Sequence, residues 1–209
     1  MPILADPLYE SIEDDADRYR QLIADGELVE AGVFAMYRAI PYKIYLGADR
    51  LVGNSLAQCR LLVLTKGHDI VYSCYYKVAE NEYFGNRAVQ VEVRQAPHLP
   101  GLARSMMRHY FLREFDALRT DLSGTAAGRE MWRSFYKQYR KELYFFKGHV
   151  NIDLRLSNGS NNQDAACPDR VTHLKHIENG CSVRDEMWHD NKDGNVVVLY
   201  ASNKPLWTE

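Results

Sequence analysis

Cysteine is scarce in this chain, with four residues in 209. Such a low content does not support a fold held together by disulfides, so we expect the thiols to be reduced. No run of about 18 apolar residues is present, which predicts that no helix spans a membrane. The N-terminus is acidic and lacks the basic and long apolar regions of a signal peptide, and this favours a cytoplasmic location.

An excess of one charge is also missing, because 26 Lys and Arg stand against 28 Asp and Glu, for a net charge of −2. The overall charge therefore does not favour nucleic acid as a partner. The charges are unevenly placed, however: residues 1–30 hold nine acids and two arginines, whereas residues 101–148 hold ten basic and five acidic residues. These segments either neutralise each other or leave the basic one to meet a phosphate-bearing partner.

Hydrophobic residues make up 46% of the chain, enough for a sizeable core. Their spacing and the turn residues between them predict three helices and seven strands. The predicted helices cover residues 8–24, 101–112 and 125–139, and the predicted strands cover 58–64, 70–78, 88–94, 115–120, 143–146, 150–156 and 195–200. This order predicts an α/β (α+β) fold with one mixed central sheet flanked by helices. We expect a domain over residues 1–156, with a polar extension over 157–209 that packs on it or completes it.

The most informative segment is VEVRQAPHLPGLARSMMRHY, residues 91–110. The strand before it alternates, with valines on one face and Gln90, Glu92 and Arg94 on the other. The strand then enters a loop in which Gly101 and the small Ala103 begin a helix. Unpaired N–H groups and the dipole at a helix start favour anion binding, and a glycine lets a phosphate approach. The segment lacks the glycine and lysine pattern of a P-loop and the second and third glycines of a dinucleotide fingerprint.

This segment resembles motif A of the GCN5-related N-acetyltransferases, the GNAT superfamily. Val91 and Val93 take the strand positions of that motif, and His98 stands where arginine or glutamine is usual. Gly101 and Ala103 take its two small positions. The resemblance covers about residues 55–147 and includes the run Gly-Arg-Glu-Met-Trp at 128–132.

The resemblance implies a substrate and a reaction. Acetyl-CoA would be the cosubstrate, bound by Val91, Val93, His98 and the amides of residues 101–103, which include Leu102. The acetyl group would pass to an amine of a protein or a small molecule, or to an aminoacyl group. The family's usual tyrosine position is occupied by Trp132, and Tyr136 lies one helical turn further on.

Candidate catalytic residues follow from this comparison. Tyr136 would protonate the departing thiolate, because a tyrosine pKa near 10 matches a thiolate of comparable basicity. Glu92 would act as the base, and Asp121 and Ser123 stand at the C-terminal end of a predicted strand, where sites gather. Each has an ordinary alternative: a core tyrosine, a solvated carboxylate, and a turn with a helix N-cap.

A group of possible metal ligands in the extension is loosely spaced, and we predict that it binds no metal. Structural zinc sites have closer pairs of ligands than this segment offers. The residues are Cys167, His173, His176, Cys181 and His189.

Two other functions stay open. The departures at His98 and Pro100 favour a GNAT-like module without catalysis, acting in binding or as a virion-type structural component. The basic span 101–148 fits a relative of the phage Mom proteins, which modify DNA bases, although the net charge does not favour it. A homodimer is also open.

Overall fold

The computed structural model describes residues 12–48, 50–51, 58–81, 85–120, 126–151, 172–173 and 195–205. Its helices are α1 (Ile12–Ala24), α2 (Leu102–Met106), α3 (Leu112–Glu114) and α4 (Ala126–Tyr139), and a π-helical turn, η1 (Met107–Phe111), joins α2 to α3. Its strands are β1 (Leu28–Phe34), β2 (Tyr42–Gly47), β3 (Arg50–Leu51), β4 (Gln58–Lys66), β5 (Asp69–Asn81), β6 (Gly85–Gln95), β7 (Ala117–Arg119), β8 (Tyr144–Asn151), β9 (Thr172–His173) and β10 (Asn195–Ser202).

One mixed sheet contains these strands in the order β1-β2-β4-β5-β6-β7-β10-β8-β9, and β3 pairs with β4. Neighbouring strands are antiparallel except β6 and β7, which run parallel. The predicted α+β fold with one mixed central sheet flanked by helices is therefore confirmed. Because β10 lies between β7 and β8, residues 195–202 of the predicted extension belong to the same sheet.

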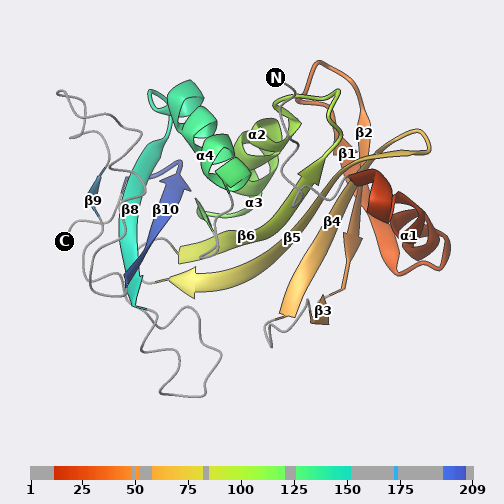
Figure 1. The fold of residues 1–209 in the computed structure, drawn as a ribbon, viewed down its shortest axis with the longest axis horizontal. Helices are drawn as coiled ribbons and strands as arrows, with labels where there is room; N and C mark the ends of the chain where they lie inside the picture. Colours follow the sequence, from red (N-terminus) through yellow and green to blue (C-terminus); the bar gives the residue numbers. More distant parts are fainter. Residues whose placement is uncertain are drawn as a thin grey trace, which may run out of the picture.

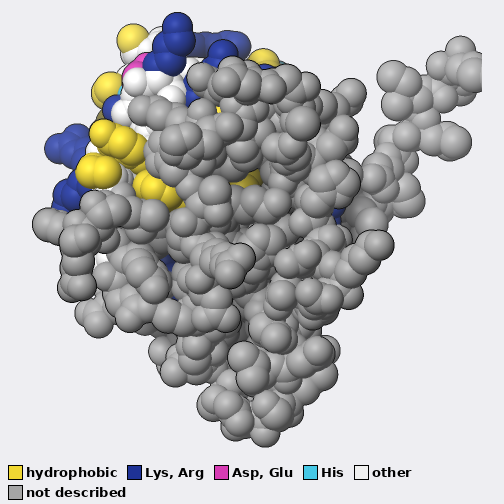
Figure 2. All heavy atoms as spheres, turned by 90° about the vertical axis from the view of Figure 1, so that its left-hand side faces the viewer, with side chains coloured by type: hydrophobic (Ala, Val, Ile, Leu, Met, Phe, Trp, Pro, Cys, Tyr) yellow, Lys and Arg dark blue, Asp and Glu magenta, His cyan; other side chains and the backbone are white. Residues whose placement is uncertain are grey.

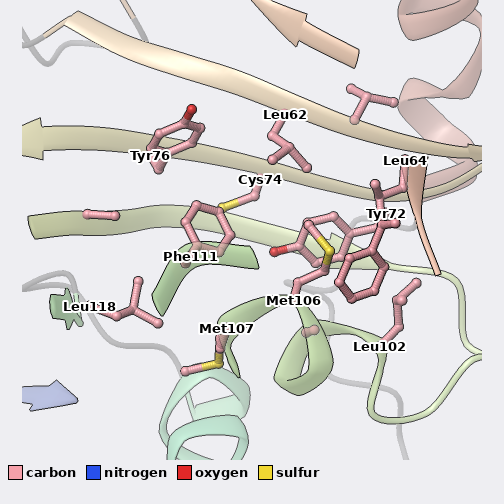
Figure 3. Close-up of a cluster of buried hydrophobic side chains, with 14 of the residues drawn as sticks. Leu62, Leu64, Tyr72, Cys74, Tyr76, Leu102, Met106, Met107, Phe111 and Leu118 are labelled. Atoms are coloured by element: carbon pink, nitrogen blue, oxygen red, sulfur yellow. The ribbon is translucent and has the colours of Figure 1, made fainter. Parts of the chain in front are cut away.

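Helices cover both faces of the sheet (Figure 1). On one face α1 packs against β5, where the Tyr19 hydroxyl donates a hydrogen bond to Ser73 Oγ at 3.3 Å. On the other face the α2–η1–α3 segment packs against β5, and Tyr76 meets the ring of Phe111 edge-on at 5.2 Å between centroids. Tyr72, Cys74 and Tyr76 all point from β5 toward this helical layer (Figure 3).

The hairpin of β4 and β5 agrees with its prediction. The turn contains Gly67 with a φ of +62°, a left-handed conformation that glycine adopts without strain. Both strands are longer than predicted. The helix predicted after Gly101 is also present, and the π-helical turn η1 interrupts its α-helical hydrogen bonding.

The first part of the sheet was missed. Residues 33–45 received no assignment from the sequence, yet they contain the end of β1 and most of β2. β1 lies at the edge of the sheet and leaves Val29 and Val33 exposed, so its burial does not follow the alternation that marks a half-buried strand. The prediction of two strands at 143–146 and 150–156 was also wrong, since β8 runs unbroken from Tyr144 to Asn151.

A bulge in β6 overturns the predicted alternation of this strand. Tyr75 lies opposite Glu92 and the next residue, Tyr76, lies opposite Gln90, so Val91 is one extra residue in the ladder. Successive residues of β5 point to opposite faces, and directly opposed residues share a face. Gln90 therefore faces the α2 layer and Glu92 faces α1, whereas the sequence placed both on one polar face.

No helix within the described ranges is long and apolar enough to cross a membrane.

Candidate functional site

The parallel strands β6 and β7 separate soon after they meet. They pair over three residues only, and the last pair is Val89 with Arg119. Beyond it, Thr120 is held by β10: its N–H donates to Leu199 O at 3.0 Å, and its Oγ1 accepts from the Leu199 N–H at 3.1 Å. β6 continues to Gln95 paired with β5 on its other side, so within the described residues the edge of β6 that faced β7 has no strand partner there. Ligands in α/β sheets commonly bind where strands separate at their carboxyl ends.

The loop between β6 and α2 has the predicted glycine at the helix start. Gly101 has a φ of +89°, so the chain turns there through a left-handed conformation. The two following amides are already hydrogen-bonded: Leu102 N–H donates to Leu99 O at 3.2 Å, and Ala103 N–H donates to the side-chain oxygen of Gln95 at 2.9 Å. A phosphate at Ala103 would have to replace the Gln95 side chain.

Two arginines that the sequence did not single out border this loop. A Cβ built on Gly101 would lie 3.0 Å from an Nη atom of Arg104, so this guanidinium lies over the helix start. The hydroxyl of Tyr37, in the β1–β2 connection, donates to Pro100 O at 2.8 Å, and the Arg38 guanidinium lies 5.0 Å from the centre of the Tyr37 ring. His98 is exposed on the same loop. The positive charge expected of an anion site is therefore present, and arginine supplies it.

The resemblance to motif A also predicted two strand residues, Val91 and Val93, as part of the cosubstrate site. Val93 is half-buried against the core. For Val91 the structure describes the backbone only, as the extra residue of the bulge.

A buried polar cluster lies between β5, β6 and the α2 layer. Gln90 is 4% exposed, and neither its Nε2 nor its Oε1 has a hydrogen-bond partner in the described part of the chain. The hydroxyl of Tyr72 is buried and also lacks a hydrogen bond of ordinary geometry among these residues, and the Cys74 thiol is the weak polar partner beside both side chains. Burial raises the pKa of the Cys74 thiol to about 12, although Tyr72 and Gln90 both act to lower it. A thiol with this pKa is neutral at physiological pH and is no nucleophile.

Glu92, the predicted base, is part of an ion-pair network. Arg94 contacts Glu92 at 2.6 Å and Asp15 of α1 at 2.5 Å, and its side chain is only 16% exposed. The Glu92 side chain is more open, at 37%. This network joins α1 to the sheet, and the Glu92 carboxylate is occupied by Arg94.

Tyr136, the predicted acid, lies in the interface between α4 and β8. Its side chain is 3% exposed and meets Phe145 edge-on at 5.0 Å between ring centroids. Trp132 is buried on the same helix beside Phe135. Tyr139 is buried next to His109, and burial raises its pKa, followed by the charge of Glu142. The rings of Tyr136 and Tyr139 therefore both pack in the interior, in addition to any role of their hydroxyl groups.

Several predicted residues lie outside the described residues. Asp121 and Ser123 belong to the segment between β7 and α4, and the predicted metal-ligand group falls in the extension, where only the backbone of His173 is described, in β9. Within the described ranges, no three His, Cys, Asp or Glu side chains come together as a metal site.

Sequence reasoning missed Gln90, Gln95, Arg38 and Arg104. A signal existed for Arg104, because a basic residue three positions after Gly101 lies in the first turn of the helix. No signal in the sequence marked Gln90, because its burial depends on the bulge at Val91.

Comparison of the chain with protein-family models, with curated proteins and with solved structures finds no match.

Proposed function

We propose that this chain is an acyl-CoA-dependent N-acyltransferase that transfers an acetyl group from acetyl-CoA to an amine of a protein or a small molecule. The observation that carries the proposal is the separation of β6 and β7 after Val89 and Arg119, directly before the loop and helix at Gly101. The resemblance of residues 91–103 to motif A of the GNAT superfamily supports the same function.

The free edge of β6 suits the pantetheine arm of CoA. Residues 90–95 have no strand partner on that side within the described residues, so main-chain groups of β6 face the space left by β7. An extended ligand that carries amides can add to a sheet edge as a further strand would. The pantetheine arm has two amide groups, and its thiol end would reach toward the last β6–β7 pair.

The loop and its arginines suit the phosphates. With the thiol end near Val89, the diphosphate would lie toward Gly101, where helix-start amides and the Arg104 guanidinium offer positive charge. Arg38 adds a second cation across the loop. The Gln95 side chain would rotate away from Ala103 as the phosphate enters.

The reaction moves two protons besides the acyl group. The acceptor nitrogen attacks the thioester carbonyl carbon, the C–S bond breaks, the nitrogen loses one proton and the sulfur gains one. We assign the first transfer to Glu92 or a water beside it, and the second to Tyr136. Asp121 and Ser123 belong to the proposed acceptor side. We also propose a cytoplasmic location. Acyl-CoA is available there, and the free thiols of Cys59 and Cys74 agree with its reducing conditions.

The decisive experiment is calorimetric titration with acetyl-CoA. Wild-type protein is expected to bind, and Gly101→Val to lose binding, because the branched side chain occupies the approach of the phosphate and strains a residue at φ +89°. Gly26→Val is the matched control: Gly26 also has a positive φ, +75°, but ends α1 with no atom within 4 Å of the added Cβ. Equal affinity of wild type and Gly101→Val, or no binding by wild type, would contradict the proposal. Binding without acetyl transfer to any amine would favour the module without catalysis.

A DNA-modifying relative is the second candidate, and one feature of α4 favours it. Arg129, Arg133 and Lys137 follow one another at steps of four and so lie along one side of the helix, with Arg140 and Lys141 just beyond it. Lys and Arg side chains gather at this end of the molecule around hydrophobic ones (Figure 2). If this stripe binds duplex DNA, the affinity falls steeply between about 50 and about 200 mM salt.

A further inference from the structure

Gln90 is an unusual residue to find in the interior. The bulge at Val91 turns its side chain from the polar face of β6 to the face that packs against α2. There it is 4% exposed, and within the described residues neither end of its amide makes a hydrogen bond of ordinary geometry; the thiol of Cys74 beside it is a weak partner. A buried polar group without a partner lowers stability, and most such groups in proteins are paired with protein or water. A bound ligand that completes the pairing explains why a glutamine stands here.

The position of Gln90 identifies where such a ligand would lie. It is the first residue of β6 after the last pair with β7, Val89 with Arg119. Thr120, its counterpart on the other strand, is held away by two hydrogen bonds to Leu199 of β10. The backbone of Gln90 therefore lies at the point where the two parallel strands begin to separate, and its side chain leaves the sheet on the α2 face, beside the inner end of the proposed acyl-CoA site.

The chemistry of the surroundings restricts the ligand to a neutral group. The polar side chains of β5 on this face are the Tyr72 hydroxyl, the Cys74 thiol and the hydroxyl of Tyr76 directly opposite Gln90; all three are buried, and none is a cation or a carboxylate. An ion would lose its hydration here without a countercharge from these three residues. A carbonyl oxygen is neutral, accepts a hydrogen bond from an amide and gains negative charge only during reaction.

We propose that the side-chain amide of Gln90 donates a hydrogen bond to the carbonyl oxygen of the acyl thioester, and that it stabilises the oxyanion formed when the amine attacks. This inference rests on the proposed function. As the C–N bond forms, the π electrons of the carbonyl move to the oxygen, and the Gln90 N–H donates its hydrogen bond to the resulting oxyanion. As the C–S bond breaks, they return and the thiolate leaves. A donor fixed in a dry site needs little reorganisation during this change.

The test compares acetyl-CoA with CoA, which lacks the carbonyl group. Gln90→Leu is expected to bind CoA as wild type does and acetyl-CoA roughly threefold to tenfold more weakly, the effect of one neutral hydrogen bond. The infrared band of the carbonyl of bound ¹³C-labelled acetyl-CoA should lie at lower frequency in wild type and return toward its value in water in the variant. Gln90→Met, of similar length, replaces the leucine variant if that protein does not fold.

Tyr42→Phe is the matched control, because it also removes a buried polar group that makes no hydrogen bond in the described part of the chain, in this case a hydroxyl on β2. It should change neither affinity nor the carbonyl band. If wild type binds acetyl-CoA and Gln90→Leu leaves both the affinity ratio and the band unchanged, the role of Gln90 is wrong while the proposed function stands. If wild type binds neither CoA nor acetyl-CoA, both are wrong.

Discussion

The side-chain oxygen of Gln95 accepts a hydrogen bond from the Ala103 N–H at 2.9 Å, so the last residue of β6 caps the helix that begins after the loop. A helix start leaves several N–H groups without helical partners, and a side-chain oxygen is their usual substitute for water or an anion. Gln95 thus occupies one of the three amides at which the resemblance to motif A places acetyl-CoA. The cap and the proposed ligand compete for the same donor.

Gln95→Ala tests this competition. Loss of the cap should lower the free energy of unfolding by about 1 kcal/mol. The affinity for CoA should rise, because the Ala103 N–H no longer has to exchange one partner for another. Urea unfolding and calorimetry give the two quantities. Gln21→Ala, which removes an exposed hydrogen bond to Asp25 at 2.8 Å, is the control and should change neither strongly. A drop in CoA affinity would mean that Gln95 assists the ligand.

Tyr136→Phe tests proton donation to the leaving thiolate. The ring packing on Phe145 remains in the variant, so the fold and the affinity for acetyl-CoA should be kept. The rate of acetyl transfer should fall by a factor of about 100 to 10,000, the usual effect of losing a general acid. Hydroxylamine can serve as a small acceptor in this assay. Tyr139→Phe is the comparison variant. A stable Tyr136→Phe protein with the full rate of acetyl transfer would show that another residue protonates the thiolate, and Tyr139 would be the next residue to examine.

His109 should make the protein less stable in mild acid. Burial lowers the pKa of His109 below its ordinary value of 6.5, and the charge of Arg108 lowers it further. The unfolded chain therefore takes up a proton at a higher pH than the folded protein does, so stability is lost as pH falls from 6.5 toward the folded pKa. Urea unfolding at several pH values should show a shallower loss in His109→Gln. Identical pH profiles for the two proteins would contradict this account.

Cys74 should resist thiol reagents in the folded protein. Its thiol is fully buried, and burial raises its pKa to about 12, so almost no thiolate is present at neutral pH. Cys59 is buried as well. Alkylation followed by peptide mapping should leave both unmodified in native protein and modify both in urea. Modification of Cys74 in native protein at the rate of an unfolded peptide would contradict the burial described here.

The sequence predicted best where hydrophobic alternation and turn chemistry act locally. The hairpin around Gly67 and helix α4 are of this kind, since both depend on neighbouring residues. Strands β1 and β2 were missed because an edge strand with Val29 and Val33 exposed does not show the burial pattern of an inner strand.

The site was harder to predict because it depends on partners distant in sequence. VQVEVRQ alternates without a break, so nothing local marks Val91 as a bulge. The bulge arises from the register with β5, and only that register brings Gln90 into the interior. Gln95 reaches Ala103 across eight positions and a loop, and Tyr37 reaches Pro100 across 63 positions. Gly101 was predicted because a glycine in the loop directly before a helix start is visible in the local sequence.

The place of β10 has a consequence for the order in which the chain can fold. β1 to β6 pair almost entirely with strands near them in sequence, so this half of the sheet can assemble while the ribosome is still adding later residues. β7 and β8 lie on either side of β10 and have no direct pairing with each other in the described ladders. Residues 195–202 must therefore be synthesised before β8 can join the sheet, and the closure of this long-range connection is expected to be the slow step of folding.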